Sequence, residues 1–502
     1  MNRRSRTRWF AGAASLAVLA GLVGTPVAGA AVANPRYRNY VAPGAMAARA
    51  GEPSIGVNWK TGAVFLQAGF ETDKVAFSPT GTATWTDVSP PVEAASLDPL
   101  LYSDPANGRV FVSQLTGLNS VTQFTDDDGK TYLPTTGGGI PSGVDHQSIG
   151  SGPYPKGGVA RPLTPFPNAV YYCSQSLYAA FCSRSDAGGA AFGVGSPLFT
   201  ECDGTIHGHV RVSPDGTVYV PNSSCRGGQG FAVSTDAGLT WTVRTVPGSA
   251  ELGAISDPSV ASGSDNTTYF GYVDGDGHPK VAVTRDRGVH FAEPVDVGAR
   301  LGIKNAAFPA VIAGDGARAA IAFLGTTTAG NSQAVNFGQD GDVYTGAEYH
   351  LYIATTYDRG AHWTLVDATG KDPVQRGRIC QLGTTACMDA NGNSPDRNLL
   401  DFMDIQLDKQ GRVLVGWPDG CTGACVNSTL ISSNRHLSKG VVTRQNGGSG
   451  LFAQTVTKPV VLASRPHAPT GPRLAATGLT VGAPAAGLGL LLLIVGLRRR
   501  RT

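Results

Sequence analysis

The clearest pattern in this chain is a series of short runs in which apolar and polar residues alternate, separated by turn-forming residues. Segment 257–297 shows it best, because DPSVASG, TTYFGYV, HPKVAVT and VHFAEPVDV each read as one short strand with Gly, Asp or Asn between them. Alternation with a period of about two is typical of strands, and turns at this spacing connect antiparallel neighbours. We therefore expect four-stranded antiparallel units.

A turn motif recurs before the last strand of these units. It follows the pattern Ser/Thr-x-Asp-x-Gly-x-x-aromatic, in which Asp binds the backbone of its own turn, Gly takes a positive φ and the aromatic ring covers the apolar layer below. The copies are STDAGLTW (234–241), TRDRGVHF (284–291), TYDRGAHW (356–363), TDDDGKTY (125–132), the looser SRSDAGGAAF (183–192) and FSPTGTATW (77–85).

A second repeat opens each unit and sets its period. Openings begin with an acidic residue, His or Phe, often followed by Pro, and recur roughly every 45–60 residues, close to the period of propeller blades. They start at Glu52, Asp98, His146, His207, Asp257, Phe308 and Asp401. The pattern predicts an all-β fold, a β-propeller of seven blades over residues 45–456, with six blades as the alternative. ISSNRHLSKGVVT, near residue 431, is interpreted as an eroded box of the last blade.

The N-terminus has the three parts of a secretory signal peptide, which we place at residues 1–33. Four arginines between residues 3 and 8 precede an apolar run at 11–27 and the small-residue site Ala28-Gly29-Ala30. A membrane anchor is the alternative, although the run is short and broken by glycines. Arg3-Arg4 leaves a twin-arginine export route open.

The C-terminus resembles a sortase sorting signal of the Leu-Ala-x-Thr-Gly type found in actinobacteria. Its pentapeptide precedes an apolar segment at 479–497, just long enough to span a membrane, and the chain then ends in arginines that favour the cytoplasmic side. The resemblance implies that sortase cuts within residues 474–502 and joins the protein to the cell wall, with the Pro-rich segment 457–473 as spacer. A plain C-terminal membrane anchor is the alternative. The pentapeptide is Leu474, Ala475, Ala476, Thr477 and Gly478.

Charge and cysteine content limit the classes of partner and indicate the redox compartment of the protein. The net charge is +3, but eight arginines lie in the two ends that processing removes, so the body is mildly acidic, which argues against nucleic-acid binding. An even number of cysteines suits an oxidising compartment. Nearest-neighbour spacing favours disulfides Cys173–Cys182, Cys202–Cys225, Cys380–Cys387 and Cys421–Cys425, with a zinc site at Cys421 and Cys425 as the weaker alternative.

Together, boxes and openings resemble the Asp-box (BNR) propellers, a superfamily of sialidases, other glycoside hydrolases and many non-enzymes. The resemblance covers residues 52–452 and implies the fold, with the box residues Asp126, Asp236, Asp286 and Asp358 acting as structural turns on the outer rim. Sialidases of this superfamily bind a carboxylate with three arginines, one within Arg-Ile-Pro. This chain has no Arg-Ile-Pro, only Arg161-Pro162, so true sialidase activity is not expected.

The openings are the candidate site. The first strand of a propeller blade lines the central channel, so residues that lead into these strands converge on one axis. Carboxylates there can serve as acid and base in glycoside hydrolysis, and we take Asp257, Asp401 and Glu52 as the candidate catalytic residues. The candidate ligand-binding residues are Asp98, His146, His207, His209 and Asp404. The alternative is that these residues only shape the turns that lead into the strands.

The segment 379–404 carries a second, weaker signal. Asp389, Asn391 and Asn393 alternate like the first calcium ligands of an EF-hand loop, and Asp396 offers a further oxygen, so Ca²⁺ is the one cofactor considered. A solvated loop is the alternative. Arg378 and Arg397 flank the segment and are candidates for gripping an anionic or sugar ligand.

These observations predict an exported, wall-attached, monomeric propeller whose channel mouth binds extracellular carbohydrate. If it is an enzyme, the expected class is a glycoside hydrolase of sialidase-like fold. The rival hypothesis is a non-catalytic adhesin or scaffold that presents a surface ligand site. Expected partners are a glycan and, during anchoring, sortase.

Overall fold

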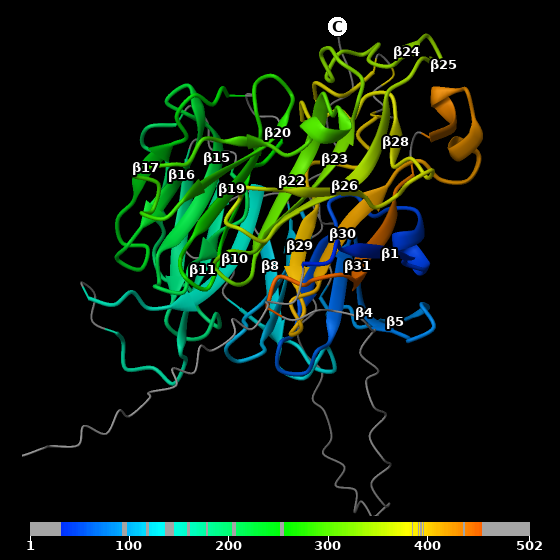
Figure 1. Cartoon of the computed structure of the whole chain (residues 1–502). Coiled ribbons are helices and arrows are strands. Elements are labelled where there is room, and N and C mark those ends of the chain that lie inside the picture. Colours follow the sequence, from blue (N-terminus) through cyan, green and yellow to red (C-terminus); the bar gives the residue numbers. More distant parts are fainter. Residues whose placement is uncertain are drawn as a thin grey trace, which may run out of the picture. The chain divides into compact units, whose positions relative to one another are not determined.

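The chain folds into a β-propeller of seven blades, which confirms the predicted fold class and blade number. The computed structural model describes residues 32–92, 98–116, 120–135, 145–157, 161–176, 179–202, 207–251, 256–383, 385–389, 391, 394, 396–434 and 437–453. All of these belong to the first of two compact units, Met1–Val460. Figure 1 shows strands grouped into several separate sheets, and the strands that pair within them are antiparallel.

Each blade runs from an inner to an outer strand. The first three blades are β2 (Ser54–Val57), β3 (Val64–Ala68), β4 (Glu71–Phe77), β5 (Ala83–Asp87); β6 (Leu100–Ser103), β7 (Val110–Leu115), β8 (Ser120–Thr125), β9 (Leu133–Pro134); and β10 (Asp145–Pro153), β11 (Asn168–Gln175), β12 (Ala180–Ser185), β13 (Ser196–Pro197).

The fourth and fifth blades are β14 (Arg211–Val212), β15 (Val218–Cys225), β16 (Gly228–Ser234), β17 (Thr242–Thr245) and β18 (Ser259–Ser262), β19 (Thr268–Val273), β20 (Pro279–Thr284), β21 (Val295–Asp296). The sixth is β22 (Asn305–Ala313), β23 (Ala319–Thr326), β26 (Glu348–Thr356), β27 (Thr364–Asp367), with β28 (Gln375–Arg376) also paired to β26 and a hairpin of β24 (Gln339–Asp340) and β25 (Val343–Tyr344) inserted. The 3-10 helices described are Gly44–Ala47, Ala299–Leu301, Gly423–Asn427 and Ile431–Asn434.

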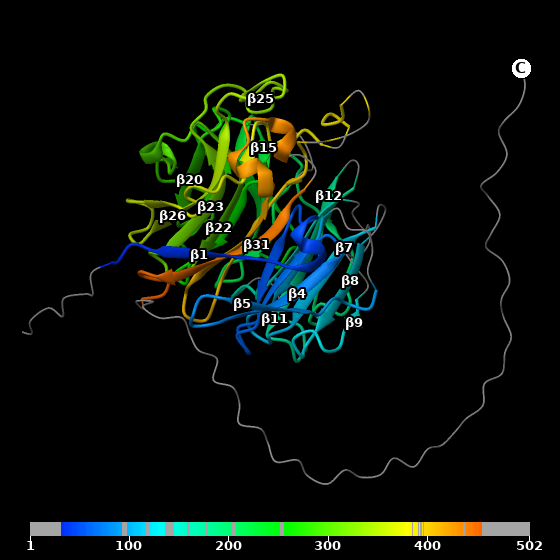
Figure 2. The ribbon, with the colours of Figure 1, turned by 90° about the vertical axis from the view of Figure 1, so that its right-hand side faces the viewer.

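The last blade joins the two ends of the propeller. Its strands are β29 (Asp404–Leu407), β30 (Val413–Asp419), β31 (Lys439–Gly447) and, outermost, the N-terminal strand β1 (Arg36–Val41). In Figures 1 and 2 β1 lies beside β31.

The propeller therefore begins before the predicted boundary at residue 45. The interpretation of 431–443 as an eroded box was wrong, because Ile431–Asn434 is a 3-10 helix and the fourth strand comes from the other end of the chain.

The core lies between neighbouring blades. Second strands are buried on both faces, as in β23 (AAIAFLGT), because each is packed against a sheet on either side, whereas the outer strand β5 is largely exposed. The ring of Phe231 in the fourth blade lies 5.6 Å from that of Phe270 in the fifth, for example. Apolar burial of this kind is the main favourable contribution to folding.

Neighbouring inner strands are tied by a repeated hydrogen bond. The hydroxyl oxygens of Ser54, Ser148 and Ser259 accept from the backbone N–H groups of Leu101 (2.9 Å), Val210 (2.6 Å) and Val311 (3.0 Å), each in the next blade. In the seventh blade the same position is Asp404, whose carboxylate accepts from the N–H of Ile55 at 3.4 Å. We call these four residues the blade latches.

The box turns connect third and fourth strands at the outer rim, as the resemblance implies. Asp236 accepts hydrogen bonds from the Ser234 hydroxyl (2.7 Å), the Leu239 and Thr240 N–H groups (3.1 and 2.9 Å) and the Thr240 hydroxyl (2.5 Å). Ala237 and Gly238 both have positive φ, 59° and 79°. The turn therefore satisfies its own aspartate.

The assignment of Asp126 as a box aspartate was wrong by one position. Asp127 accepts from the N–H of Thr131 at 2.9 Å and from the Thr125 hydroxyl at 2.8 Å, which is the box geometry. Asp126 instead receives two hydrogen bonds from Arg109, at 2.8 and 2.7 Å.

Four disulfides join the nearest-neighbour cysteines: Cys173–Cys182, Cys202–Cys225, Cys380–Cys387 and Cys421–Cys425. In the described part of the chain no helix is long and apolar enough to cross a membrane. The predicted signal peptide, except for its last two residues, and the spacer, sorting signal and membrane segment lie outside the described residues.

Candidate functional site

The openings of the blades gather ionisable side chains around one end of the channel. Glu52, Asp98, His207, Asp257 and Asp401 each lie just before an inner strand, His146 is the second residue of the inner strand β10, and neighbouring inner strands are in contact around the ring. Asp145, on β10, and Arg211, on β14, join them. We call these eight residues, with His209, Arg397 and Asp404, the channel cluster.

Two ion pairs cross the axis. His146 Nδ1 of the third blade lies 3.0 Å from Asp257 Oδ2 of the fifth. Arg211 of the fourth blade donates to Asp404 of the seventh at 3.4 Å, and His209 Nδ1 lies 4.0 Å from the same oxygen. These pairs join blades that are not neighbours in the ring, so side chains close the channel at this level.

Two pairs of carboxyl groups lie along one arc of the ring, from the seventh blade through the first and second to the third. Glu52 Oε1 accepts from the backbone N–H of Asp401 at 3.1 Å, and the two side chains interact directly. The backbone N–H of His146 donates to both Asp98 (3.0 Å) and Asp145 (3.1 Å). In each pair one member is buried, Glu52 or Asp98, and the other reaches solvent, Asp401 or Asp145.

Burial and crowding change the protonation of these groups. Burial and the nearby carboxylates of Asp98 and Asp401 raise the pKa of Glu52 well above its usual range. Burial raises the pKa of Asp98 to about 7. Burial also raises the pKa of Asp257 above its usual value.

The pKa values of the nearby histidines shift in opposite directions. Although burial opposes the charged imidazole, Asp257 and Asp145 together raise the pKa of His146 well above its usual value. No carboxylate of the described residues is hydrogen-bonded to His207, and burial lowers the pKa of His207 to about 4. Burial and the adjacent Arg211 hold the pKa of His209 well below its usual value.

The two predicted gripping arginines have different positions. Arg397 donates to both oxygens of Asp401, with Nη1 at 2.6 Å from Oδ1, and so belongs to the cluster. Arg378 is buried outside it, with Nε 2.6 Å from Asp396 and Nη1 3.1 Å from the Gln333 carbonyl oxygen.

The predicted calcium loop is only partly described. Asp389 accepts from the N–H of Asn391 at 2.8 Å, a local turn, and Asp396 pairs with Arg378. Asn393 lies outside the described residues. Among the described side chains no group of three or more His, Cys, Asp and Glu residues is placed to hold a metal ion, and calcium binding by this loop stays a prediction.

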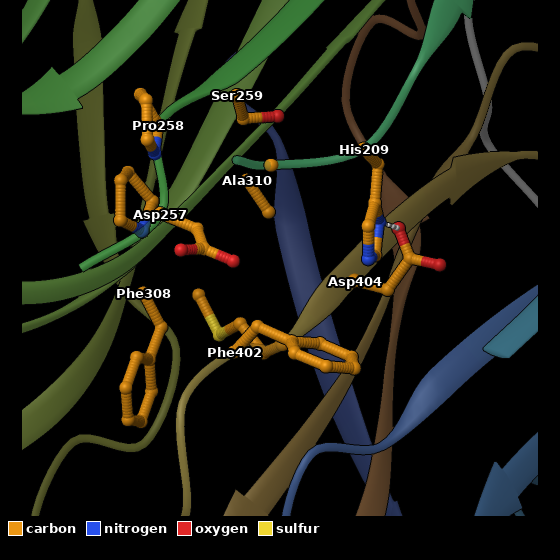
Figure 3. Close-up of a pocket in the computed structure, with 11 residues that line it drawn as sticks. His209, Asp257, Pro258, Ser259, Phe308, Ala310, Phe402 and Asp404 are labelled. Atoms are coloured by element: carbon orange, nitrogen blue, oxygen red, sulfur yellow. Dashed lines mark ion pairs between the residues drawn. The ribbon is translucent and has the colours of Figure 1, made fainter. Parts of the chain in front are cut away.

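A small cavity lies between the two cross-axis pairs. Its volume of about 20 Å³ has room for roughly one water molecule. Figure 3 shows the Asp257 carboxylate pointing into the cavity, His209 and Asp404 across from it, and the ring of Phe402 at its border. His209 and Phe402 are in edge contact, with ring centroids 5.1 Å apart.

Three opening residues have a strained backbone. Glu52, His146 and Phe308 have φ values of 54°, 49° and 56°, which non-glycine residues rarely adopt. Such conformations cost about 1–3 kcal/mol each and concentrate at functional sites. Sequence reasoning identified all three positions but contained no signal for the strain.

Sequence reasoning missed Asp145 and Arg211. Asp145 directly precedes the opening residue His146, so extending each opening by one residue would have found it. Arg211 lies within a strand, and its partner Asp404 is 193 positions away, so no local pattern indicates the pair.

No protein-family model matches the chain, and no curated protein matches its sequence. Solved structures do match. One is a protein of unknown function from Dyadobacter fermentans (12% identity, TM-score 0.39, covering 82% of this chain and 99% of that one). Another is a fungal lectin from Aleuria aurantia, described as a six-bladed β-propeller with a novel fucose recognition mode (13%, 0.38, 62% and 93%). A third is AofleA from Arthrobotrys oligospora (10%, 0.40, 66% and 90%). At these identities and TM-scores, the chemistry of this chain's own residues decides what it does.

Proposed function

We propose that this protein is an exported, wall-attached β-propeller of the Asp-box class that binds an extracellular glycan at the mouth of its channel. The observation that carries the proposal is the channel cluster, in which ionisable residues from six of the seven blades meet at one end of the channel. The box turns at Asp127, Asp236, Asp286 and Asp358 support the class.

The fold itself does not require these charges. Three of the four blade latches are serines, so a neutral hydroxyl does the same work as Asp404. Burying carboxylates and arginines costs several kcal/mol per ion before any pairing. A cluster of perturbed carboxyl groups in a channel is therefore a candidate for ligand binding.

The cluster does not suit sialic acid. Both of its arginines are already bound by carboxylates, Arg397 by Asp401 and Arg211 by Asp404, whereas sialidases of the Asp-box class use arginines to hold the carboxylate of the substrate. Carboxyl groups also outnumber the cations, so an anionic sugar would be repelled. The proposed ligand is a neutral or cationic glycan.

Hydrolysis is the second candidate function. The raised pKa of Asp98, to about 7, gives a carboxyl group that keeps its proton near neutral pH, as a general acid requires. The small cavity favours binding alone, because about 20 Å³ cannot admit a sugar ring to the buried groups. A non-catalytic module would use only the partly exposed members, Asp145 and Asp401, at the mouth.

A glycan array probed with residues 34–456 tests the binding proposal. We expect Asp401→Asn to weaken binding by about 10–100-fold, the loss expected for one charged hydrogen bond. Asp87→Asn, on the exposed outer strand β5, is the matched control and should bind normally. Any glycan that binds is then incubated with the protein, and an increase in its reducing ends would show hydrolysis. Equal binding by wild type and Asp401→Asn, with both proteins folded, would exclude the channel mouth as the site.

Attachment is tested separately. If the tail is a sorting signal, the protein should remain covalently in the wall fraction with Thr477 as its last residue. Thr477→Ala should release it from the wall but leave it in the membrane. Full recovery of wild type by detergent, with Arg498–Arg501 intact, would support the plain membrane anchor instead.

A further inference from the structure

The channel cluster holds more carboxyl groups than cations. Its cations are Arg211, Arg397 and the His146 imidazole, which its acidic neighbours keep protonated. Against these stand the six carboxyl groups of Glu52, Asp98, Asp145, Asp257, Asp401 and Asp404. Because the remaining negative charges are crowded and buried, the free protein offsets them by retaining protons on some of the carboxyl groups.

Two polar atoms inside the cluster have no hydrogen-bond partner among the residues that the structure describes. They are Glu52 Oε2 and His207 Nε2, and both residues are only 1% exposed. Buried polar atoms are normally paired. Nδ1 of His207 donates to the Gly208 carbonyl oxygen at 2.9 Å, which leaves its Nε2 as an acceptor without a donor. The side chains of Glu52 and Asp401 can hydrogen-bond to one another only while one of them keeps a proton, and a cationic donor can take the place of that proton.

From these observations we infer that the glycan carries a protonated amine, so that the ligand is an amino sugar whose ammonium group binds between the partly exposed carboxylates of Asp145 and Asp401 at the mouth. The inference rests on the proposed function and specifies its ligand. The ammonium group supplies three N–H donors, and its charge takes the place of protons held by Glu52 and Asp98.

The aromatic side chains beside the cluster do not reach the sugar ring. Phe308 and Phe402 border the cavity and are buried, and the neutral imidazole of His209 lies against Phe402. Because the cavity has a volume of only about 20 Å³, the sugar ring stays outside it, and the carboxyl groups at the mouth carry the recognition.

A metal ion explains the cluster less well. The described residues contain no group of three or more His, Cys, Asp and Glu side chains placed to hold a metal. Arg397 also occupies both oxygens of Asp401. A bulky ammonium-bearing ligand can approach the solvent-facing side of Asp401 and Asp145 without displacing the arginine.

Calorimetry with a matched pair of ligands tests the inference. The ligands are β-1,4-linked oligoglucosamine and the same oligosaccharide with every amine acetylated. We expect the free amine to bind at least about tenfold more tightly, which corresponds to one ion pair of about 1.4 kcal/mol. Measured at about pH 5.5, where the amines stay protonated, in buffers of different ionisation enthalpy, its binding should release protons from the carboxyl groups of the cluster.

Single substitutions show which carboxyl groups recognise the amine. Asp145→Asn and Asp401→Asn should reduce the preference for the free amine, Asp98→Asn should reduce the number of protons released, and Asp87→Asn should change neither. The conservative Asn variants keep the size of each side chain, and thermal melting checks that each protein is folded.

The outcomes separate the two proposals. If both oligosaccharides bind equally, or the acetylated one binds better, the amine inference fails while glycan binding stands. If neither binds, and a glycan array also shows no ligand, the proposed function fails as well. If oligolysine binds in this way and no saccharide binds, the ligand is a cationic peptide. That result would overturn the inference.

Discussion

At the scale of single residues, one structural position supports two kinds of chemistry. Ser54, Ser148 and Ser259 tie neighbouring blades with a neutral hydroxyl, while Asp404 does so with a carboxylate that also receives Arg211 from across the channel. The blade openings behave similarly, since Phe308 and His146 share a strained backbone but only His146 contributes charge. The scaffold sets positions, and the side chain at each position sets the function.

Asp98 gives the sharpest test of this electrostatic picture. Its pKa is about 7 in the folded protein and 3.8 without the fold, so between these values the folded state binds more protons. Stability must then fall as the pH rises through this window. We expect Asp98→Asn to gain stability relative to wild type on going from about pH 4 to about pH 8, by on the order of 4 kcal/mol at most. Urea unfolding at a series of pH values measures it.

Asp145→Asn is the matched control, because the stability that Asp145 contributes should change with pH in the opposite direction. Although burial raises the pKa of Asp145, the charge of His146 lowers it overall. Asp145 therefore stabilises the fold above its unfolded pKa, and this contribution is lost as the pH falls. Identical pH profiles for the two variants would contradict the assignment of a buried, protonated Asp98 and a partly exposed, ionised Asp145 to this pair.

The sequence predicted those parts of the site that depend on local patterns and missed those that depend on contacts between distant residues. The openings were found because a turn followed by a strand recurs locally, and these residues do meet around the channel. Arg211–Asp404 and His146–Asp257 were not foreseen as pairs, since they form only when blades distant in sequence close into a ring. The protonation of Glu52 and Asp98 also depends on that closure.

At the scale of elements, the box turn is a self-contained unit, which explains why the sequence predicted it well. Its hydrogen bonds all lie within a few residues of Asp236. The error at Asp126 arose because three consecutive aspartates, Asp126 to Asp128, precede Gly129, and only the spacing from Thr125 identifies Asp127 as the box residue.

Removing the box carboxylate should destabilise one blade without affecting the channel. Asp236→Ala leaves the N–H groups of Leu239 and Thr240 without their acceptor, and we expect a loss of about 2 kcal/mol in the free energy of unfolding. Thr235→Ala, an exposed change in the same turn, is the control. Denaturant unfolding measures stability, and glycan binding by the folded fraction should be unchanged. Loss of binding in a folded Asp236→Ala protein would contradict a purely structural box.

At the scale of the whole molecule, the ring is closed by strands from opposite ends of the chain. β1 pairs with β31 in the register Tyr40↔Val442 and Val41↔Val441, about as far apart in sequence as the propeller allows. Sequence periodicity predicted seven blades because each repeat is local, but it placed the start at residue 45, since a lone strand has no repeat of its own. Closure at the last blade also holds the channel cluster together, because Asp401 and Asp404 lie in that blade's opening.

Deleting β1 tests this dependence. A chain that starts at Ala42 loses the outer strand of the last blade and the buried ring of Tyr40, which lies 4.8 Å from Phe77. The lost ring alone should cost about 3–5 kcal/mol. A chain that starts at Pro35 keeps β1 and is the control. We expect the shorter chain to melt at a lower temperature and to expose the edge of β31, with dimers or aggregates in size-exclusion chromatography. If the ring positions the site, any glycan binding should also weaken in the shorter chain at temperatures where it remains folded. A truncated chain with unchanged melting and binding would show that β1 is dispensable and that the remaining strands hold the last blade in place.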